Sequence, residues 1–132
     1  MSPTPIQPGE RFMNHRHGLI ALVSLAALAL LAGCARPIHD KATLERIRAE
    51  ARTLMRAPPE QYSVVPESQW PLSIAGLRPE TVTVYPDGVN ISIKAYFDGG
   101  WGYFIPRHQE QVPEPAGRFS EVSKGVLWYG PY

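Results

Sequence analysis

The stretch TVTVYPDGVNISIKAYF, residues 81–97, decides the fold of this chain. On both sides of Pro86-Asp87-Gly88, apolar residues alternate with polar ones, which is typical of strands that have one buried face. Proline, aspartate and glycine in succession favour a tight turn. The stretch therefore predicts an antiparallel β-hairpin. Its more polar face carries Asn90, Ser92, Lys94 and Tyr96.

Two further strands are predicted after this hairpin. Asp98-Gly99-Gly100 favours a second turn, and the residues from Trp101 to Ile105 then form a third strand that Pro106 ends. An apolar run at 122–129 predicts a fourth strand. Between the third and fourth strands, residues 107–117 are polar and contain two prolines, which predicts an exposed loop.

A helix is predicted before the sheet, at the N-terminal end of the folded domain, from Asp40 to about Arg56. Asp40 is suited to the N-cap, and Pro58 and Pro59 end the helix. The apolar residues at helical spacing are Leu44, Ile47, Ala51, Leu54 and Met55. One N-terminal amphipathic helix and about four antiparallel strands predict a small α+β domain in which the helix covers one face of the sheet.

A different apolar run lies nearer the start of the chain, from Leu19 to Gly33. It follows the basic Arg16, contains one polar residue, Ser24, and is followed by Cys34, in the order of an export signal. A helix over these 15 residues reaches only about 22 Å, which is short of the roughly 30 Å hydrocarbon core of a bilayer. The run therefore predicts a signal peptide rather than a membrane span.

The stretch Leu31-Ala32-Gly33-Cys34 resembles the lipobox of bacterial lipoprotein signal peptides, which reads leucine, small, small, cysteine. The resemblance implies that residues 1–33 are removed, with Met13 as an alternative start of translation. It also implies that Cys34, the only cysteine of the chain, receives a diacylglycerol on its sulfur and becomes the first mature residue.

The same resemblance implies a place in the cell. Ala35 stands where many such lipoproteins carry the aspartate that retains them in the inner membrane, so the implied location is the inner leaflet of the outer membrane, facing the periplasm. Residues 34–39 then form a lipidated tether and residues 40–132 a single domain. This domain is similar in general character to small envelope lipoproteins of proteobacteria.

The composition of the mature part offers little for catalysis. Its eleven basic and eleven acidic residues balance, so no nucleic-acid partner is expected. It has two histidines, His39 and His108, too few for a typical zinc site, and it contains neither a Gly-x-Ser-x-Gly elbow nor a phosphate-loop motif. We therefore expect no enzyme activity, no metal and no cofactor.

These observations favour a lipid-anchored, non-enzymatic domain that binds another macromolecule of the envelope, most specifically a protein. An immunity-type protein that caps a toxin is a sharper version of this hypothesis. The expected surface is the polar face of the hairpin together with the loop at 107–117. The candidate contact residues are Lys94, Tyr96, Trp101, Arg107, His108 and Glu110.

Three other interpretations remain open. The first is a small-ligand-binding or hydrolytic protein with a cleft near Trp70 and His108. The second is a purely structural component of the envelope. The third concerns the predicted helix, whose surplus of basic residues close to the anchor would favour contact with anionic lipid headgroups.

Overall fold

The computed structural model describes residue 3 and residues 37–38, 40–97 and 99–131. The expected signal peptide, the lipobox and Cys34 lie outside these residues. Within the described ranges, no helix is long and apolar enough to cross a membrane.

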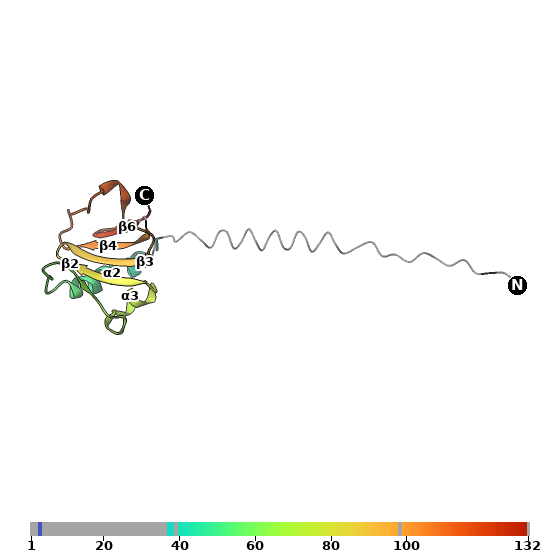
Figure 1. Cartoon of the computed structure of the whole chain (residues 1–132), viewed down its shortest axis with the longest axis horizontal. Coiled ribbons are helices and arrows are strands. Elements are labelled where there is room, and N and C mark those ends of the chain that lie inside the picture. Colours follow the sequence, from blue (N-terminus) through green and yellow to red (C-terminus); the bar gives the residue numbers. More distant parts are fainter. Residues whose placement is uncertain (1–2, 4–36, 39, 98, 132) are drawn as a thin grey trace. The chain divides into compact units, whose positions relative to one another are not determined.

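The described chain is α+β and contains one antiparallel sheet in the order β1-β2-β3-β4-β6-β5 (Figure 1). The strands are β1 (Ser63–Val64), β2 (Thr81–Tyr85), β3 (Gly88–Lys94), β4 (Trp101–Pro106), β5 (Phe119–Ser123) and β6 (Val126–Tyr129). The predicted hairpin is confirmed, because β2 and β3 pair with Val84 opposite Val89. The third strand is also confirmed as β4.

Other details of the predicted sheet are wrong. The sheet has six strands rather than about four. The run at 122–129, predicted as one strand, contains the end of β5 and all of β6, which are separated by a turn in which Gly125 adopts a φ of 70°. Strand β1 has only two residues, too few to show the alternation from which strands are predicted.

The edges of the sheet are short or irregular. One edge is β1, and the other is β5, which pairs with β6 with a shift of register between Glu121 and Ser123. A second shift of register occurs between Ser92 and Lys94, where β3 pairs with β4. Such bulges bend a strand and interrupt its ladder of hydrogen bonds.

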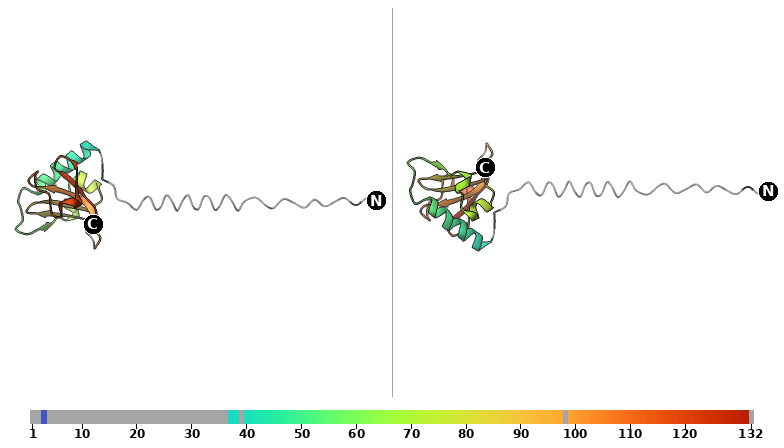
Figure 2. Two further views of the ribbon diagram at one scale, coloured as in Figure 1. Left: turned by 90° about the horizontal axis from the view of Figure 1, so that it is seen from above. Right: turned by 90° about the horizontal axis from the view of Figure 1, so that it is seen from below.

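The main helix is α2 (Lys41–Leu54), which lies inside the chain rather than at its N terminus. The predicted N-cap is confirmed, because the Asp40 carboxylate accepts a hydrogen bond from the Thr43 amide at 3.0 Å. Hydrogen bonds from the side chain and the backbone of Thr43 lower the pKa of Asp40. Figure 2 shows α2 lying along one face of the sheet.

Three shorter helical segments follow, namely η1 (Glu67–Gln69), α3 (Leu72–Gly76) and η2 (Ala116–Arg118). The carboxylate of Glu50 on α2 accepts hydrogen bonds from the backbone amides of Ser73 and Ile74, each at 3.0 Å. Glu50 therefore satisfies amides in the first turn of α3 that the helix itself leaves unpaired. This contact spans more than 20 residues of sequence, so no local pattern predicts it.

The core lies between α2 and one face of the sheet. Its buried residues include Leu44, Ile47, Ala51 and Met55 from the helix region and Val82, Val84, Val89, Ile91, Tyr103, Ile105 and Val126 from the strands. Each fully buried aliphatic side chain contributes about 1.5–3 kcal/mol. The predicted apolar stripe of the helix is thus confirmed, with Leu54 half-buried at its margin.

Candidate functional site

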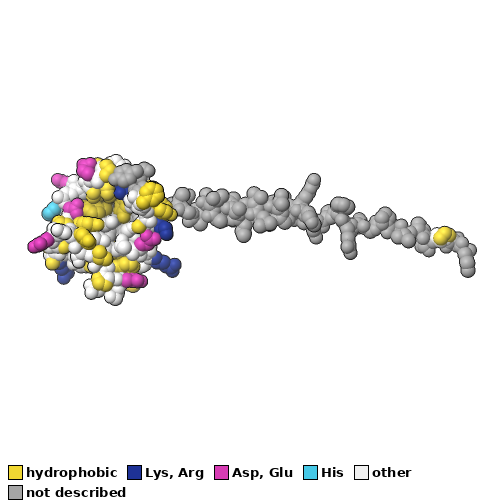
Figure 3. Space-filling view, in the orientation of Figure 1, with side chains coloured by type: hydrophobic (Ala, Val, Ile, Leu, Met, Phe, Trp, Pro, Cys, Tyr) yellow, Lys and Arg dark blue, Asp and Glu magenta, His cyan; other side chains and the backbone are white. Residues whose placement is uncertain are grey.

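The face of the sheet opposite α2 is described here as the open face. In Figure 1, α2 lies behind the sheet, so this open face is turned toward the viewer. Figure 3 has the same orientation and shows hydrophobic side chains gathered at the middle of the face. The strand pairing places on it Thr83, Tyr85, Asn90, Ser92, Phe104, Leu127, Tyr129 and Phe119.

A cavity of about 270 Å³ opens on this face. It is lined by Tyr85, Asp87, Asn90, Gly99, Phe104, Pro113, Arg118, Phe119 and Tyr129. Pro113 belongs to the loop between β4 and η2, whereas Asn90 belongs to the predicted hairpin. The cavity therefore joins the two segments that the sequence indicated as one binding surface. Its volume is close to the lower end of the range for small-ligand sites.

Two glycines of the open face allow aromatic rings to lie close to the sheet. A Cβ added at Gly88 would lie 2.6 Å from the Phe104 ring, and one added at Gly102 would lie 2.8 Å from the Tyr129 hydroxyl. The ring of Phe119 completes this wall, 6.2 Å from the Phe104 centroid and 5.7 Å from the Tyr129 centroid. The close approach of both rings thus depends on positions without a side chain.

Polar groups lie beside these rings. The Tyr129 hydroxyl donates a hydrogen bond to Asn90 Oδ1 at 2.7 Å. Burial raises the pKa of Tyr129, although hydrogen bonds with Ser92 and Asn90 oppose the rise. The phenol therefore stays protonated at neutral pH and acts as a donor. Because Asn90 Oδ1 accepts this proton, the Nδ2 amide is the end of the Asn90 side chain that can donate to a ligand.

Arg118 holds one side of the cavity. Its Nε donates to the Gly130 carbonyl at 2.7 Å and its Nη2 to the Gly100 carbonyl at 3.0 Å. The guanidinium also lies 4.9 Å from the centroid of the Tyr129 ring, within the range of a cation–π contact. Arg118 thus ties η2 to the start of β4 and to the end of β6. Asp87, which is exposed, adds a carboxylate to the lining.

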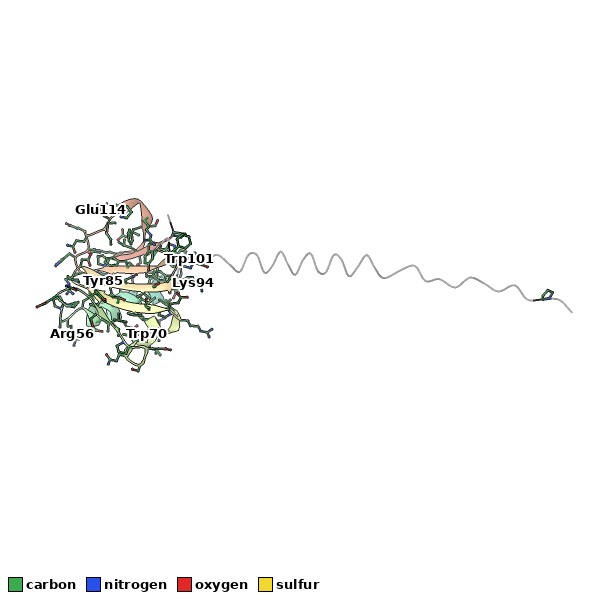
Figure 4. The ribbon with its side chains drawn as sticks, in the orientation of Figure 1. Arg56, Trp70, Tyr85, Lys94, Trp101 and Glu114 are labelled. Atoms are coloured by element: carbon green, nitrogen blue, oxygen red, sulfur yellow. The ribbon has the colours of Figure 1, made fainter. Side chains whose placement is uncertain are left out.

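Three of the predicted contact residues come together at one end of β4. Lys94 lies opposite Trp101 in the strand ladder, and the rings of Tyr96 and Trp101 are 5.2 Å apart. The Lys94 ammonium forms an ion pair with Glu80 at 3.2 Å. Figure 4 shows Lys94 and Trp101 at the same end of the sheet, away from Tyr85.

The other three predicted residues follow the opposite end of β4. Arg107 donates from Nε to the Pro86 carbonyl and from Nη1 to the Met55 carbonyl, both at 2.6 Å, so it joins the β2–β3 turn to the end of α2. His108 and Glu110 are exposed. A strand of this length separates the two groups by about 17 Å. The six residues therefore form no single site, and none of them lines the cavity.

Further cavities of the described part of the chain include the following two. One of about 490 Å³ lies between α2 and the β5–β6 turn and is lined by Lys41, Glu45, Arg48, Val122, Ser123 and Lys124. Another of about 190 Å³ lies beside β1 and the end of α2. Trp70 and His108 line none of the three, and the Trp70 indole donates to the Val65 carbonyl at 2.9 Å.

The described ranges contain no cluster of three or more His, Cys, Asp or Glu residues that could hold a metal ion. Comparison of the chain with protein-family models, curated sequences and solved structures found no match. Function is therefore inferred from the residues and their geometry.

Proposed function

We propose that this protein is a lipid-anchored envelope protein whose folded domain binds a segment of another protein at the open face. The observation that carries the proposal is the cavity in which the rings of Tyr85, Phe104, Phe119 and Tyr129 meet the polar groups of Asn90 and Arg118. Tyrosine and arginine are enriched among the residues that dominate binding energy at protein interfaces.

The lining residues favour binding over catalysis. They include no serine, cysteine, histidine or lysine, and the titratable groups of the cavity are Asp87, Arg118 and the two tyrosines, Tyr85 and Tyr129. The cavity has the size for one apolar or aromatic side chain of a partner, with Asn90 and Asp87 placed to bond the polar groups on either side of it. The bound segment would bury its apolar group against the aromatic wall and keep its backbone near the rim.

Site-specific photo-crosslinking tests this proposal. With p-benzoylphenylalanine at position 113, on the wall of the cavity, we expect one discrete covalent adduct in cells. Phe119→Ala removes part of the aromatic wall and should lower the adduct yield by about tenfold or more, the range expected for a residue that dominates an interface. The readout is the adduct band on an immunoblot, followed by mass spectrometry.

The matched control places the same photo-reactive residue at position 62. Tyr62 is 61% exposed and does not line the cavity, although its ring lies 6.2 Å from that of Tyr85. No adduct is expected from this position. Equal adducts from both positions, or an adduct at position 113 that survives Phe119→Ala, would contradict binding at the cavity.

The anchor is tested separately by metabolic labelling with a radioactive fatty acid. Cys34→Ala should abolish the label and prevent cleavage before position 34, whereas Ala35→Ser should keep both. Loss of acylation removes the stable attachment, because a firm anchor needs two or more acyl chains. Intact mass spectrometry of the membrane fraction provides the second readout. Label that persists in Cys34→Ala would rule out lipidation at this residue.

A further inference from the structure

The tip of the β3–β4 hairpin exposes large aromatic side chains. Phe97 is fully exposed, at 105% of its reference area, and Tyr96 is 50% exposed. The Tyr96 ring packs against Trp101 at the start of β4, with centroids 5.2 Å apart. We call Tyr96, Phe97 and Trp101 the aromatic tip, in which Phe97 and Tyr96 are exposed and Trp101 is half-buried with its indole Nε1 inside the domain. Contiguous exposed apolar surface of this kind marks a contact with a partner or with lipid.

The first described residues of the domain lie beside this tip. The backbone amide of Ile38 donates a hydrogen bond to the Tyr103 hydroxyl at 2.6 Å. Tyr103 follows Trp101 by two residues on β4, so both side chains leave the same face of the strand about 7 Å apart. Ile38 also packs against the core. Ile38 is therefore held on the face of β4 that also carries Trp101.

The length of the connecting chain limits how far the tip can be from a membrane. Cys34 precedes Ile38 by four residues, which span at most about 14 Å when fully extended. On the proposed lipid anchor, on which this inference rests, the surface around Ile38 is held against the bilayer. A short tether leaves little freedom for the domain to turn this end away.

We infer that the aromatic tip is a second membrane contact, in which Phe97 enters the boundary between headgroups and acyl chains and the half-exposed Tyr96 lies at headgroup level, with Trp101 supporting it from within the domain. Tyrosine and tryptophan are enriched at this level because one part of each ring is apolar and another part is polar. The contact fixes the orientation of the domain on the bilayer, which an acylated cysteine alone does not.

Lys94 and Glu80 form a pair of opposite charges near the tip, and in the sequence Asp98 directly follows Phe97. The ammonium of Lys94 is paired with Glu80 at 3.2 Å, and the Glu80 carboxylate also accepts a hydrogen bond from the Ala95 amide at 2.7 Å. Apolar burial, rather than attraction to anionic lipid, therefore drives the contact. By contrast, the cavity containing Lys41, Arg48 and Lys124 has an excess of basic groups and would require anionic headgroups. The dependence of membrane binding on anionic lipid therefore distinguishes the aromatic tip from this basic cavity.

Quenching by brominated lipid tests the inference on the full mature protein reconstituted in vesicles. Because Phe97 is fully exposed, Phe97→Trp places a new indole at the tip without disturbing the fold. We expect a shift of the added emission to shorter wavelength in vesicles of ordinary phosphatidylcholine, and its loss in vesicles of brominated phosphatidylcholine. The matched control is Tyr62→Trp, since Tyr62 lies beside Tyr85 toward the opposite end of the strands and should not be quenched.

Each outcome has a distinct meaning. Equal quenching of Phe97→Trp in neutral and anionic vesicles supports the inference. Quenching that needs anionic lipid, or none in a protein whose Cys34 carries label, overturns the tip contact and leaves the anchor intact. Absence of label on Cys34 overturns the anchor, and the tip contact with it. Protection of Phe97→Trp from aqueous iodide by an envelope protein, without vesicles, would assign the tip to a protein partner instead.

Discussion

Replacing Gly102 with alanine is expected to destabilise the domain by about 3 kcal/mol or more, at the upper end of the effects of overpacking. A Cβ at this position would lie 2.2 Å from the Ile91 carbonyl oxygen and 2.8 Å from the Tyr129 hydroxyl. The first of these atoms belongs to the backbone of the neighbouring strand, so β3 and β4 must move apart. The second belongs to the wall of the cavity.

Thermal unfolding followed by circular dichroism measures this effect. At roughly 4–8 °C per kcal/mol for a domain of this size, the expected fall in Tm is roughly 12–24 °C. Gly76→Ala is the matched control, because a Cβ at Gly76, the last residue of α3, meets nothing within 4 Å. Alanine there should stabilise the domain by about 0.5–1 kcal/mol through its helix preference. A wild-type Tm for Gly102→Ala would contradict the tight pairing of the two strands.

Arg107→Ala is expected to cost about 3 kcal/mol, because hydrogen bonds that involve a charged group contribute about 1.5–3 kcal/mol each. The substitution removes the bonds to the Pro86 and Met55 carbonyls and separates the β2–β3 turn from the end of α2. Urea unfolding with fluorescence detection gives the free energy directly. Arg107→Lys should recover only part of the loss, since an ammonium lacks the fork that reaches two carbonyls.

His108→Ala is the control for this experiment. His108 is exposed, and its backbone carbonyl accepts a hydrogen bond from the Gln111 amide at 3.0 Å, which alanine would keep. The change in unfolding free energy should stay within about 0.5 kcal/mol. If the Arg107→Ala protein is stable but forms less adduct at position 113, Arg107 contacts the partner, as the sequence predicts, rather than stabilising the fold.

The parts of the fold that the sequence predicts are those encoded locally. Alternation in 81–97 specifies β2 and β3 on its own, and Asp40 caps the helix within three residues of itself. The missed parts depend on distant contacts. Helix α3 is capped by Glu50 from another helix, and β1 is recognisable as a strand only because Ser63 and Val64 pair with β2.

In the candidate site, too, the sequence predicts the segments involved but not the individual residues. The hairpin face and the loop at 107–117 are both represented in the cavity, by Asn90 and Pro113, yet none of the six named residues lines it. Those residues are polar or aromatic groups of the kind that a sequence places on a protein surface, but Arg107 turns back to bond two carbonyls. The sequence feature that indicates the cavity is the pair of glycines, Gly88 and Gly102. They lie on one face of neighbouring strands and leave room for aromatic rings to pack against the sheet.

The two edges of the sheet affect how readily two copies of the domain can pair strand to strand. Chains confined to two dimensions collide often, and an exposed strand invites another copy to add itself and start a fibril. Here one border is only two residues long, and the other is kinked between Glu121 and Ser123. Neither edge gives a second copy a straight strand to pair with, so edge-to-edge pairing of copies is disfavoured, also where the proposed anchor would concentrate the protein on a bilayer.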